Sequence, residues 1–301
     1  MSGYEDVLVS AIIITYKRPL EILSRAIKSV INQTHRKTEI IVVNDYPEDK
    51  ESVEKIREMI DSFHDDRISY LVHEKNSGAC KARNTGINAS KGSFIALLDD
   101  DDEWLPRKLE LQLEGFTADD VGMVYSPFYN KTDDSDGVVT VRETKSGDLL
   151  EELLLDNCIG GSSMTTMRRE VFDKCGLFDE NLQSSQDYDM WVRIAEKYKV
   201  NYVGEPLTRR FLMEDSITKS YEKKKQGFLA FYSKHKHLYD NYPSAYNYIG
   251  NRTANKWIEM GHIKDGWELH RLAAKVKPFS KYNFTEPVKG LIKYIFKIRK
   301  Y

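Results

Sequence analysis

The 301-residue sequence lacks the features of a secreted or membrane-spanning protein. Its three cysteines, Cys80, Cys158 and Cys175, are an odd number at wide spacing, which argues against a disulfide framework or a zinc knuckle and favours reduced thiols. No apolar run approaches the ~20 residues that a transmembrane helix needs, and the first residues lack the pattern of a signal peptide. We therefore expect a cytoplasmic protein, either free or held peripherally at the inner face of the membrane.

The sequence also lacks a large net charge. Its 45 lysines and arginines and 47 aspartates and glutamates give a formal charge of -2, which provides no general electrostatic reason to bind nucleic acid. Hydrophobic residues make up 41% of the chain, enough to build a buried core. At this length we expect one large α/β domain with a smaller appendage.

The first 105 residues alternate short β-branched runs with amphipathic segments. Strands are predicted at residues 7–14, 39–43, 68–73 and 93–98, and helices at residues 20–32, 51–63 and 79–89. This order predicts a largely parallel, Rossmann-like sheet with helices on both faces and a ligand site beyond the carboxyl ends of the strands. Thr15, Asp45 and Asp99 each follow a predicted strand, so they should converge.

The remaining sequence is less regular. Strands are predicted near residues 122–127, 137–142 and 164–169, with a solvated hairpin turn at residues 133–137. From about Lys223 onward the sequence predicts helices only. We therefore divide the chain into an α/β domain over residues 1–220 and a helical C-terminal region over residues 221–301.

Four consecutive aspartates, Asp99, Asp100, Asp101 and Asp102, directly follow a predicted buried strand. Adjacent carboxylates repel one another unless a cation or solvent compensates their charge. Mg²⁺ and Mn²⁺ bind carboxylate oxygens and share their remaining sites with substrate phosphates. A solvated acidic loop is the alternative, but the position at a strand end favours a metal site.

A series of ordered motifs resembles the family 2 glycosyltransferases, which are inverting enzymes with the GT-A fold. The resemblance covers roughly residues 7–215. Its motifs are IITYKR at 13–18, IIVVND at 40–45, NSG at 76–78, ARNTG at 82–86, LDDDD at 98–102, GLFDE at 176–180 and QDYDMWVR at 186–193. It implies metal-dependent transfer of a sugar from a nucleotide sugar, usually a UDP-sugar, to a hydroxyl of a glycan or lipid-linked acceptor in cell-surface polysaccharide biosynthesis. Residues 1–105 would bind the donor and residues 106–220 the acceptor.

The resemblance also implies donor-binding residues. Thr15, Tyr16 and Asp45 match positions that hold the nucleotide base, with Asp45 accepting from a base N–H and Tyr16 stacking on the ring. Asn76 and Arg83 match positions that reach the nucleotide, and a guanidinium suits the paired oxygens of a diphosphate. Each of these residues also has a purely structural interpretation, as a turn former, a packed aromatic or a solvated side chain.

The same resemblance assigns the metal ligand and the catalytic base. Asp101 is predicted to bind the metal, with Asp99 or Asp100 on the ribose or a metal-bound water and Asp102 in support. Both Asp99-x-Asp101 and Asp100-x-Asp102 fit the family's DXD pattern. Asp187 matches the base, in the first turn of a predicted helix where the helix dipole favours the ionised carboxylate. A carboxylate that only stabilises the start of its helix is the alternative.

The chain departs from the family pattern at three places. Gln186 stands where Glu commonly precedes the base, and Met213 stands where many relatives have a histidine. Tyr46 and Pro47 replace the small residues usual after the base-binding aspartate, which would reshape the rim of the nucleotide pocket.

Two other functions compete with glycosyl transfer. A sugar-nucleotide nucleotidyltransferase would need a glycine-rich phosphate loop after the first strand, and residues 15–19 contain no glycine. A non-catalytic sugar-nucleotide-binding or scaffold protein would not need both the aspartate run and Asp187.

The last residues have an amphipathic pattern. Val288, Leu291, Ile292, Ile295 and Ile298 fall near one helical face, and Lys289, Lys293, Lys297 and Lys300 fall on another. Residues 288–301 are predicted either to contact an anionic membrane surface or to pack as an ordinary terminal helix. The helical C-terminal region is also a candidate oligomer contact.

Overall fold

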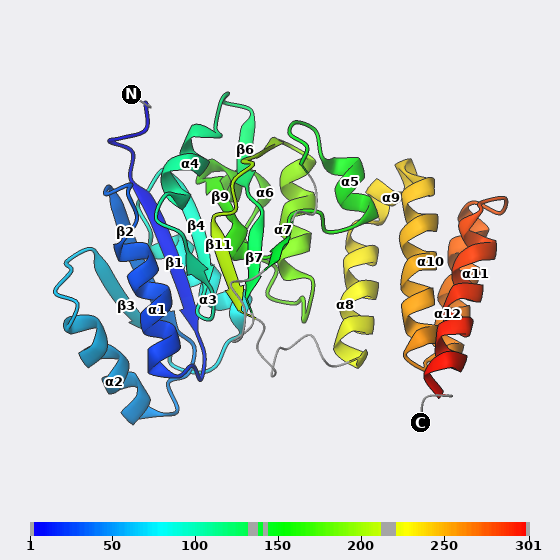
Figure 1. The fold of residues 1–301 in the computed structure, drawn as a ribbon, viewed down its shortest axis with the longest axis horizontal. Helices are drawn as coiled ribbons and strands as arrows, with labels where there is room; N and C mark the ends of the chain where they lie inside the picture. Colours follow the sequence, from blue (N-terminus) through cyan, green and yellow to red (C-terminus); the bar gives the residue numbers. More distant parts are fainter. Residues whose placement is uncertain (1–2, 132–137, 141–143, 212–220, 299–301) are drawn as a thin grey trace. The chain divides into compact units, whose positions relative to one another are not determined.

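The computed structural model describes residues 3–131, 138–140, 144–211 and 221–298 (Figure 1). The predicted hairpin turn at residues 133–137 and Met213 lie outside these residues. The chain forms two compact units. The first comprises Met1–Leu149 and Cys158–Phe228, and the second comprises Leu150–Asn157 and Leu229–Tyr301.

The first unit begins with the alternating elements that the sequence predicts. They are β1 (Val9–Thr15), α1 (Leu20–Ile31), β2 (Thr38–Asn44), α2 (Lys50–Asp61), β3 (Ile68–Val72), α3 (Ala79–Ala89) and β4 (Phe94–Asp99). The remainder contains β5 (Glu103–Trp104), α4 (Lys108–Glu114), β6 (Val121–Tyr125), β7 (Phe128–Lys131), β8 (Val138–Thr140), η1 (Ser162–Met164), β9 (Thr165–Arg168), α6 (Glu170–Cys175), α7 (Gln186–Ala195), β10 (Lys199–Tyr202) and β11 (Thr208–Phe211).

Seven strands form the main sheet, in the order β10-β6-β9-β4-β1-β2-β3. The prediction of a largely parallel sheet is confirmed, since β1, β2, β3 and β4 run parallel to their neighbours in this group. Strand β9 is the exception because it is antiparallel to both β4 and β6. A second sheet of four strands, β5-β11-β7-β8, was not predicted.

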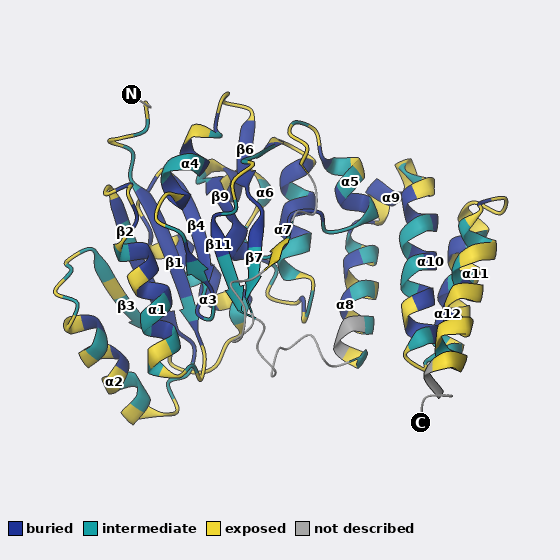
Figure 2. Ribbon diagram, viewed as in Figure 1, coloured by how far each residue is buried: buried dark blue, intermediate teal, exposed yellow. Residues whose placement is uncertain are grey.

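Helices cover both faces of this sheet, as the sequence predicts. In β1, Ala11 and Ile13 join a core cluster with Leu23 and Ile27 of α1. Ile12, which points to the opposite face, lies against Gly86 of α3. Successive residues of a strand point to opposite faces, so β1 is buried on both sides, and Figure 2 shows the same burial along the central strands.

The strand register brings the predicted strand-end residues together. Ile14 pairs with Asp99 across β1 and β4, and Thr15 pairs with Asn44 across β1 and β2. The backbone N–H of Asp45 donates to the carbonyl oxygen of Thr15 at 2.9 Å. The expected convergence of Thr15, Asp45 and Asp99 at the carboxyl edge is therefore confirmed.

The second unit is helical. It contains α5 (Leu150–Leu155), α9 (Lys236–Asn241), α10 (Pro243–Glu259), α11 (Ile263–Val276) and α12 (Tyr282–Ile298), and α8 (Tyr221–Lys234) leads into it from the first unit. Residues 150–157 belong here because the Tyr239 hydroxyl donates to the Leu154 carbonyl oxygen at 3.1 Å and Arg252 pairs with Asp156 at 2.8 Å. Among the described helices, none is long and apolar enough to span a bilayer.

Gly92 tests the packing of the connection between α3 and β4 against the start of β1. A Cβ atom at this position would lie 2.7 Å from both the Leu8 carbonyl oxygen and the Ser10 nitrogen, and backbone cannot move away cheaply. We expect Gly92→Ala to lower the free energy of unfolding by about 1–3 kcal/mol, a typical cost of overpacking. The measurement is chemical denaturation. Gly204→Ala is the control, because a Cβ there meets only a side-chain carbon at 3.8 Å, and an equal loss in both variants would contradict the explanation.

Candidate functional site

The four aspartates turn sharply at the end of β4. The N–H of Asp102 donates to the Asp99 carbonyl oxygen at 3.1 Å, and the N–H of Asp99 donates to the Ser163 hydroxyl oxygen at 3.1 Å. Asp100 and Asp102 are buried, whereas the side chains of Asp99 and Asp101 are 33% and 25% exposed. The alternating exposure makes Asp99 and Asp101 the pair that can reach a ligand.

Two arginines hold the aspartate run in place. Arg18, three residues beyond β1, donates from Nε to Asp100 Oδ1 at 2.8 Å and from Nη2 to Asp101 Oδ2 at 3.2 Å. Arg25 of α1 donates to the Asp101 carbonyl oxygen at 2.6 Å. Arg18 belongs to the first sequence motif, but the sequence predicts no role for it in the site. Like Thr15, Arg18 lies near the end of the first strand.

The aspartate run nevertheless has too little positive charge around it. Burial, together with the charge of Asp99, raises the pKa of Asp101 to about 6. Burial and the charges of Asp99 and Asp101 raise the pKa of Asp102 well above its usual value. Burial also raises the pKa of Asp100, although Arg18 opposes the shift. The ionised cluster is therefore electrostatically unfavourable, and an additional cation would stabilise it.

The side chains fit a divalent metal only as a partial ligand set. Within the described residues, no three histidine, cysteine, aspartate or glutamate side chains are grouped so as to hold a metal ion. Mg²⁺ commonly binds through one or two carboxylates and takes its other ligands from water and substrate phosphates. Asp99 and Asp101, whose side chains are partly exposed, fit that arrangement.

Arg83 of α3 connects the aspartate run with the start of α7. Its Nη2 donates to Asp99 Oδ1 at 2.9 Å, and its Nη1 lies 3.8 Å from Asp187 Oδ1. Nη1 also donates to Gln186 Oε1 at 3.4 Å. Burial alone would lower the pKa of Arg83, but the charges of Asp187 and Asp99 hold it above the usual value. The guanidinium is therefore charged and lies between two carboxylates.

Asp187 lies in the first turn of α7, as the sequence predicts. Ser185 occupies the N-cap position with φ of 61°, but its side chain forms no capping hydrogen bond. Instead, the Ser162 hydroxyl donates to Asp187 Oδ1 at 2.8 Å. Burial raises the pKa of Asp187, Arg83 opposes this shift, and Asp99 adds to it. A raised pKa brings a carboxylate closer to the working pH of a general base.

The segment around Asp187 is braced by side chains from two helices. The amide of Asn84 on α3 exchanges two hydrogen bonds, each of 2.9 Å, with the backbone of Phe178. Arg193 donates to Asp189 Oδ2 at 2.8 Å and to the Leu177 carbonyl oxygen at 3.0 Å. Asp189 and Arg193 therefore brace this segment through hydrogen bonds.

Asp45 organises the loop that follows β3. Its Oδ1 accepts from the Ser77 N–H at 2.8 Å and its Oδ2 accepts from the Gly78 N–H at 2.7 Å. His73 Nδ1 lies 2.7 Å from Asp45 Oδ1, and its Nε2 lies 2.9 Å from the Thr85 hydroxyl. Asn76 Oδ1 also accepts from the Gly78 N–H, at 3.2 Å. Asp45 and Asn76 therefore have turn-forming roles in addition to any contact with a nucleotide.

Tyr16 and Tyr46 form an aromatic corner beside this loop. Their rings pack edge to face with centroids 5.3 Å apart, and Lys17 Nζ lies 4.7 Å from the Tyr46 centroid. Tyr16 is 43% exposed, which leaves ring surface for a ligand. Thr15 is buried beside the carboxylate of Asp100. The predicted effect of Tyr46 on the rim agrees with its packing against Tyr16.

Ser162 and Ser163 are the site residues that sequence reasoning did not identify. In the structure both serines are fully buried in η1, where Ser162 contacts Asp187 and Ser163 contacts Asp99. The consecutive glycines and serines at residues 160–163 indicate an irregular backbone, but they do not predict these contacts.

Comparison with known proteins reveals a consistent set of relatives. The family profile described as glycosyl transferase family 2 matches residues 10–176. A protein of Escherichia coli K12 named as a colanic acid biosynthesis glycosyl transferase, WcaA, is 32% identical over 79% of this chain and 85% of its own length. The E. coli UDP-Glc:alpha-D-GlcNAc-diphosphoundecaprenol beta-1,3-glucosyltransferase WfgD is 28% identical over 66% of this chain and 74% of its own.

A solved structure gives the same indication for the fold. The mannosyltransferase PcManGT of Pyrobaculum calidifontis, in complex with GDP-Man and Mn²⁺, superposes with a TM-score of 0.64. The match covers 96% of this chain and 86% of that protein at 14% sequence identity. At this identity, the similarity concerns the fold alone.

The role of Asp45 in the loop can be tested by Asp45→Asn. The amide has only one acceptor oxygen, so one of the two backbone N–H groups, of Ser77 or Gly78, loses its hydrogen bond to residue 45. We expect a loss of about 1–3 kcal/mol in the free energy of unfolding and faster hydrogen exchange at Ser77 and Gly78.

Asp49→Asn is the matched control. Asp49 caps α2 by accepting from the Ser52 N–H at 3.0 Å, and asparagine caps helices as well as aspartate does. If both variants retain wild-type stability and exchange rates, Asp45 does not hold the loop.

Proposed function

The chain belongs to glycosyl transferase family 2 and has the GT-A fold, and on this basis we propose that it is an inverting, metal-dependent glycosyltransferase. It moves a sugar from a nucleotide diphosphate sugar to a hydroxyl group of a glycan or lipid-linked acceptor in polysaccharide biosynthesis. The observation that carries this proposal is the bridge that Arg83 makes between Asp99 and Asp187. This bridge places Asp99, a carboxylate on the donor side, and Asp187, a potential base, on opposite sides of the Arg83 guanidinium.

The donor in this proposal is a UDP-sugar. The name of WfgD specifies UDP-Glc, which supports this choice, whereas PcManGT binds GDP-Man. Tyr16 would stack on the base with its exposed ring surface. Asp45 Oδ2 accepts one hydrogen bond among the described contacts, and a carboxylate oxygen can accept a second, from a base N–H. Asn76 completes the proposed nucleotide contacts.

The proposed cation is Mn²⁺ or Mg²⁺, held by Asp101 with Asp99 or Asp100 on the ribose or on a metal-bound water. When bound, such an ion neutralises charge on the donor diphosphate and on the leaving group. Asp102 and Arg18 would keep the Asp101 carboxylate in position. The raised pKa of Asp101, caused by burial and then by the charge of Asp99, supports this assignment.

Asp187 is the proposed catalytic base. Its Oδ1 is oriented by the Ser162 hydroxyl, and Arg83 limits the rise of its pKa, so the carboxylate can be ionised yet still accept a proton. Asp187 takes the proton of the acceptor hydroxyl as that oxygen attacks the anomeric carbon from the face opposite the diphosphate. One displacement of this kind inverts the configuration. Arg83 stabilises charge on the departing diphosphate.

The described residues indicate the acceptor less specifically than the donor. Gln186 Nε2 donates to the Leu182 carbonyl oxygen at 2.8 Å and its Oε1 accepts from Arg83, so Gln186 supports the start of α7. A lipid-linked acceptor is proposed because WfgD acts on a diphosphoundecaprenol-linked sugar by its name. None of the three described cysteines forms a disulfide, which suits a reaction in the reducing cytoplasm.

The base assignment is tested by Asp187→Asn. The amide can still accept from Ser162 but cannot take the acceptor's proton. We expect kcat and kcat/KM to fall together by about 10²-fold or more, with donor affinity nearly unchanged. Turnover is measured as UDP release from a panel of UDP-sugars, and affinity by calorimetry with UDP and Mn²⁺.

Asp173→Asn makes the same chemical change in the first turn of another helix, at an exposed position, and should retain full activity. Retention of more than about a tenth of wild-type turnover by Asp187→Asn, equivalent to under ~1.4 kcal/mol, would place the base elsewhere.

The metal assignment is tested by Asp101→Asn. Since the pKa of Asp101 is raised in the folded protein, its ionised form opposes folding above about pH 6. Without metal at pH 7.5, the variant should therefore be more stable than wild type by about 1–2 kcal/mol, reduced from the full shift for solvent exposure. This advantage should shrink as the pH falls from about 6 to about 4, where the wild-type carboxyl is protonated in the folded state.

The variant should also lose the stabilisation that Mn²⁺ and UDP together give the wild type. Thermal unfolding with and without EDTA measures both effects. Asp119→Asn, at an exposed position, serves as the control. An unchanged response of Asp101→Asn to Mn²⁺ and UDP would overturn the assignment.

A further inference from the structure

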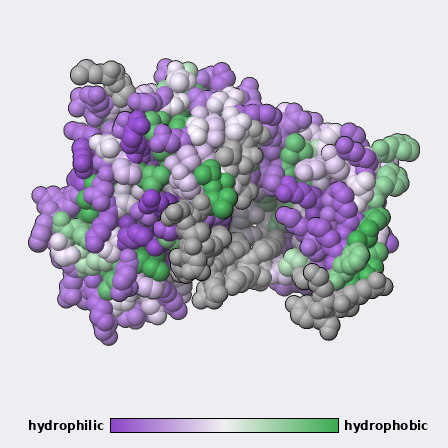
Figure 3. Space-filling model, in the orientation of Figure 1, coloured by the Kyte–Doolittle hydropathy of each residue, from purple (hydrophilic) through white to green (hydrophobic). Residues whose placement is uncertain are grey.

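Helix α12 turns its apolar face to solvent. Its large exposed hydrophobic side chains recur at helical spacing, with exposed fractions from 38% to 69%, and we call them the outer face. They are Phe284, Val288, Leu291, Ile292, Ile295 and Phe296. Figure 3 shows hydrophobic surface along this helix. A helix of a globular protein normally packs its apolar stripe against the core, so this orientation needs a physical reason.

The inner face of α12 packs on α10 through several polar contacts and a glycine, beside the ring contact between Tyr282 and Tyr248. Asn283 Oδ1 accepts from Asn247 and Asn251 at 2.7 and 2.9 Å, and Glu286 accepts from Asn255 Nδ2 at 2.7 Å. Gly290 allows a close approach, since a Cβ there would lie 2.8 Å from the Asn255 carbonyl oxygen.

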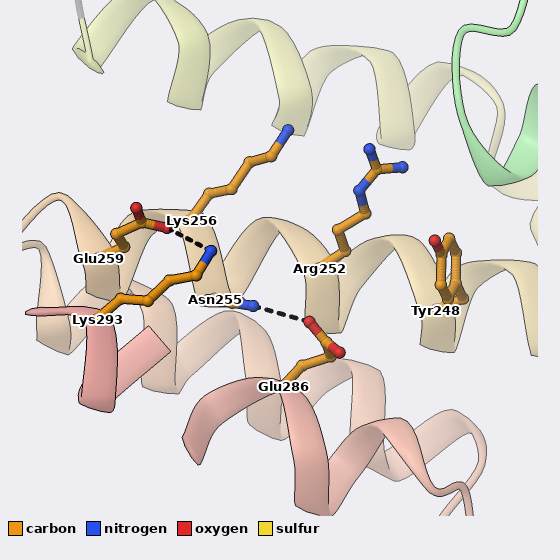
Figure 4. A pocket seen from close by; sticks show the side chains of 7 residues that line it. All are labelled: Tyr248, Arg252, Asn255, Lys256, Glu259, Glu286 and Lys293. Carbon is orange, nitrogen blue, oxygen red and sulfur yellow. Dashed lines mark hydrogen bonds and ion pairs between the residues drawn. The ribbon is translucent and has the colours of Figure 1, made fainter. Parts of the chain in front are cut away.

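The polar contacts between α12 and α10 continue as far as Lys293. Lys293 Nζ reaches Glu259 Oε2 at 3.3 Å, and Figure 4 shows this ion pair and the Asn255–Glu286 bond on the two facing helices. Together with Tyr248, Arg252 and Lys256, these side chains line a pocket of about 240 Å³. Several hydrogen bonds therefore fix α12 in its outward-facing orientation.

The exposure is concentrated in one part of the protein. Of the 15 exposed large hydrophobic residues among those described, 12 belong to the second unit and three to the larger first unit. The most exposed is Phe279, at 97%, in the connection between α11 and α12. Single exposed hydrophobic residues need no explanation, but a concentrated patch marks an interaction surface.

The charge around the outer face is strongly positive. From Arg271 to Tyr301 the sequence contains nine lysines and arginines but one acidic residue, Glu286, in a chain whose formal charge is -2. Lys277 and Lys281 flank Phe279 in the sequence. Lys289 and Lys293 pair with Glu286 and Glu259, but their side chains remain 59% exposed. This charge excludes a cationic partner and favours an anionic one.

We propose that the outer face of α12, together with Phe279, docks on an anionic lipid bilayer surface. The apolar side chains would enter the boundary between headgroups and acyl chains while the lysines reach the lipid phosphates. A second copy of the chain fits less well, because a two-fold interface would bring two strongly basic segments together. The docking extends beyond the predicted contact at residues 288–301 and does not depend on the proposed reaction.

The test is flotation of the full-length chain with vesicles of phosphatidylcholine containing about a third phosphatidylglycerol. Wild type should float with these vesicles but not with pure phosphatidylcholine, and less at 0.5 M than at 0.05 M salt, because screening weakens the electrostatic part. The Ile292→Ser/Phe296→Ser double variant should reduce the partition coefficient by about tenfold or more. Lys275→Gln/Lys281→Gln should reduce it on anionic vesicles and weaken its dependence on lipid charge, because two of the nine basic residues are neutralised.

Val138→Ser/Val139→Ser is the control, since it removes two exposed hydrophobic side chains from β8 in the first unit, and it should float like wild type. All substituted positions are exposed, so circular dichroism should show folded proteins. Failure of wild type to float on anionic vesicles, or equal flotation of wild type and the Ile292/Phe296 variant, overturns the proposal. So does light scattering that finds a wild-type dimer which this variant converts to a monomer.

Discussion

The buried guanidinium of Arg83 is the interaction on which the site depends. It lies between Asp99 at the end of β4 and Asp187 at the start of α7, two residues 88 positions apart in the sequence. Removing one partner of such a group leaves an uncompensated charge in a poorly solvated place, which is far more costly than losing a surface ion pair. Arg83 thus fixes the separation of the donor-side carboxylates from the carboxylate that we propose as the base.

The serines of η1 reinforce the same link from the other side. The Ser162 hydroxyl donates to the Asp187 carboxylate, and the hydroxyl oxygen of its neighbour Ser163 accepts from the Asp99 backbone N–H, so one short helix and one arginine contact both residues. Fixed donors of this kind keep reacting groups in position before a substrate binds. The negative charge that remains around Asp101 and Asp102 is a stability cost that a ligand-binding function can explain, since sites for cations are often unfavourable when empty.

The two units of the chain use hydrophobic side chains differently. The first unit buries the strands β1, β2 and β4 of its main sheet on both faces, which leaves its polar groups at the carboxyl edge for chemistry. The second unit holds α12 through asparagines, a glutamate and a glycine, and keeps the helix's apolar residues outside. The same amphipathic pattern can therefore build a core or a docking surface, and the polar contacts of the inner face decide between them.

The sequence by itself determined the elements and the edge at which the site lies. Helix α3 has the predicted bounds, and Thr15, Asp45 and Asp99 converge because the carboxyl ends of parallel strands share one edge. The assignment to the family also followed from ordered motifs. Only the tertiary structure decided that β9 is antiparallel, that Ser162 reaches Asp187, that His73 lies against Asp45 and that α12 faces outward. Local patterns fix periodicity and turns, whereas these contacts join residues brought together by packing, which no periodicity encodes.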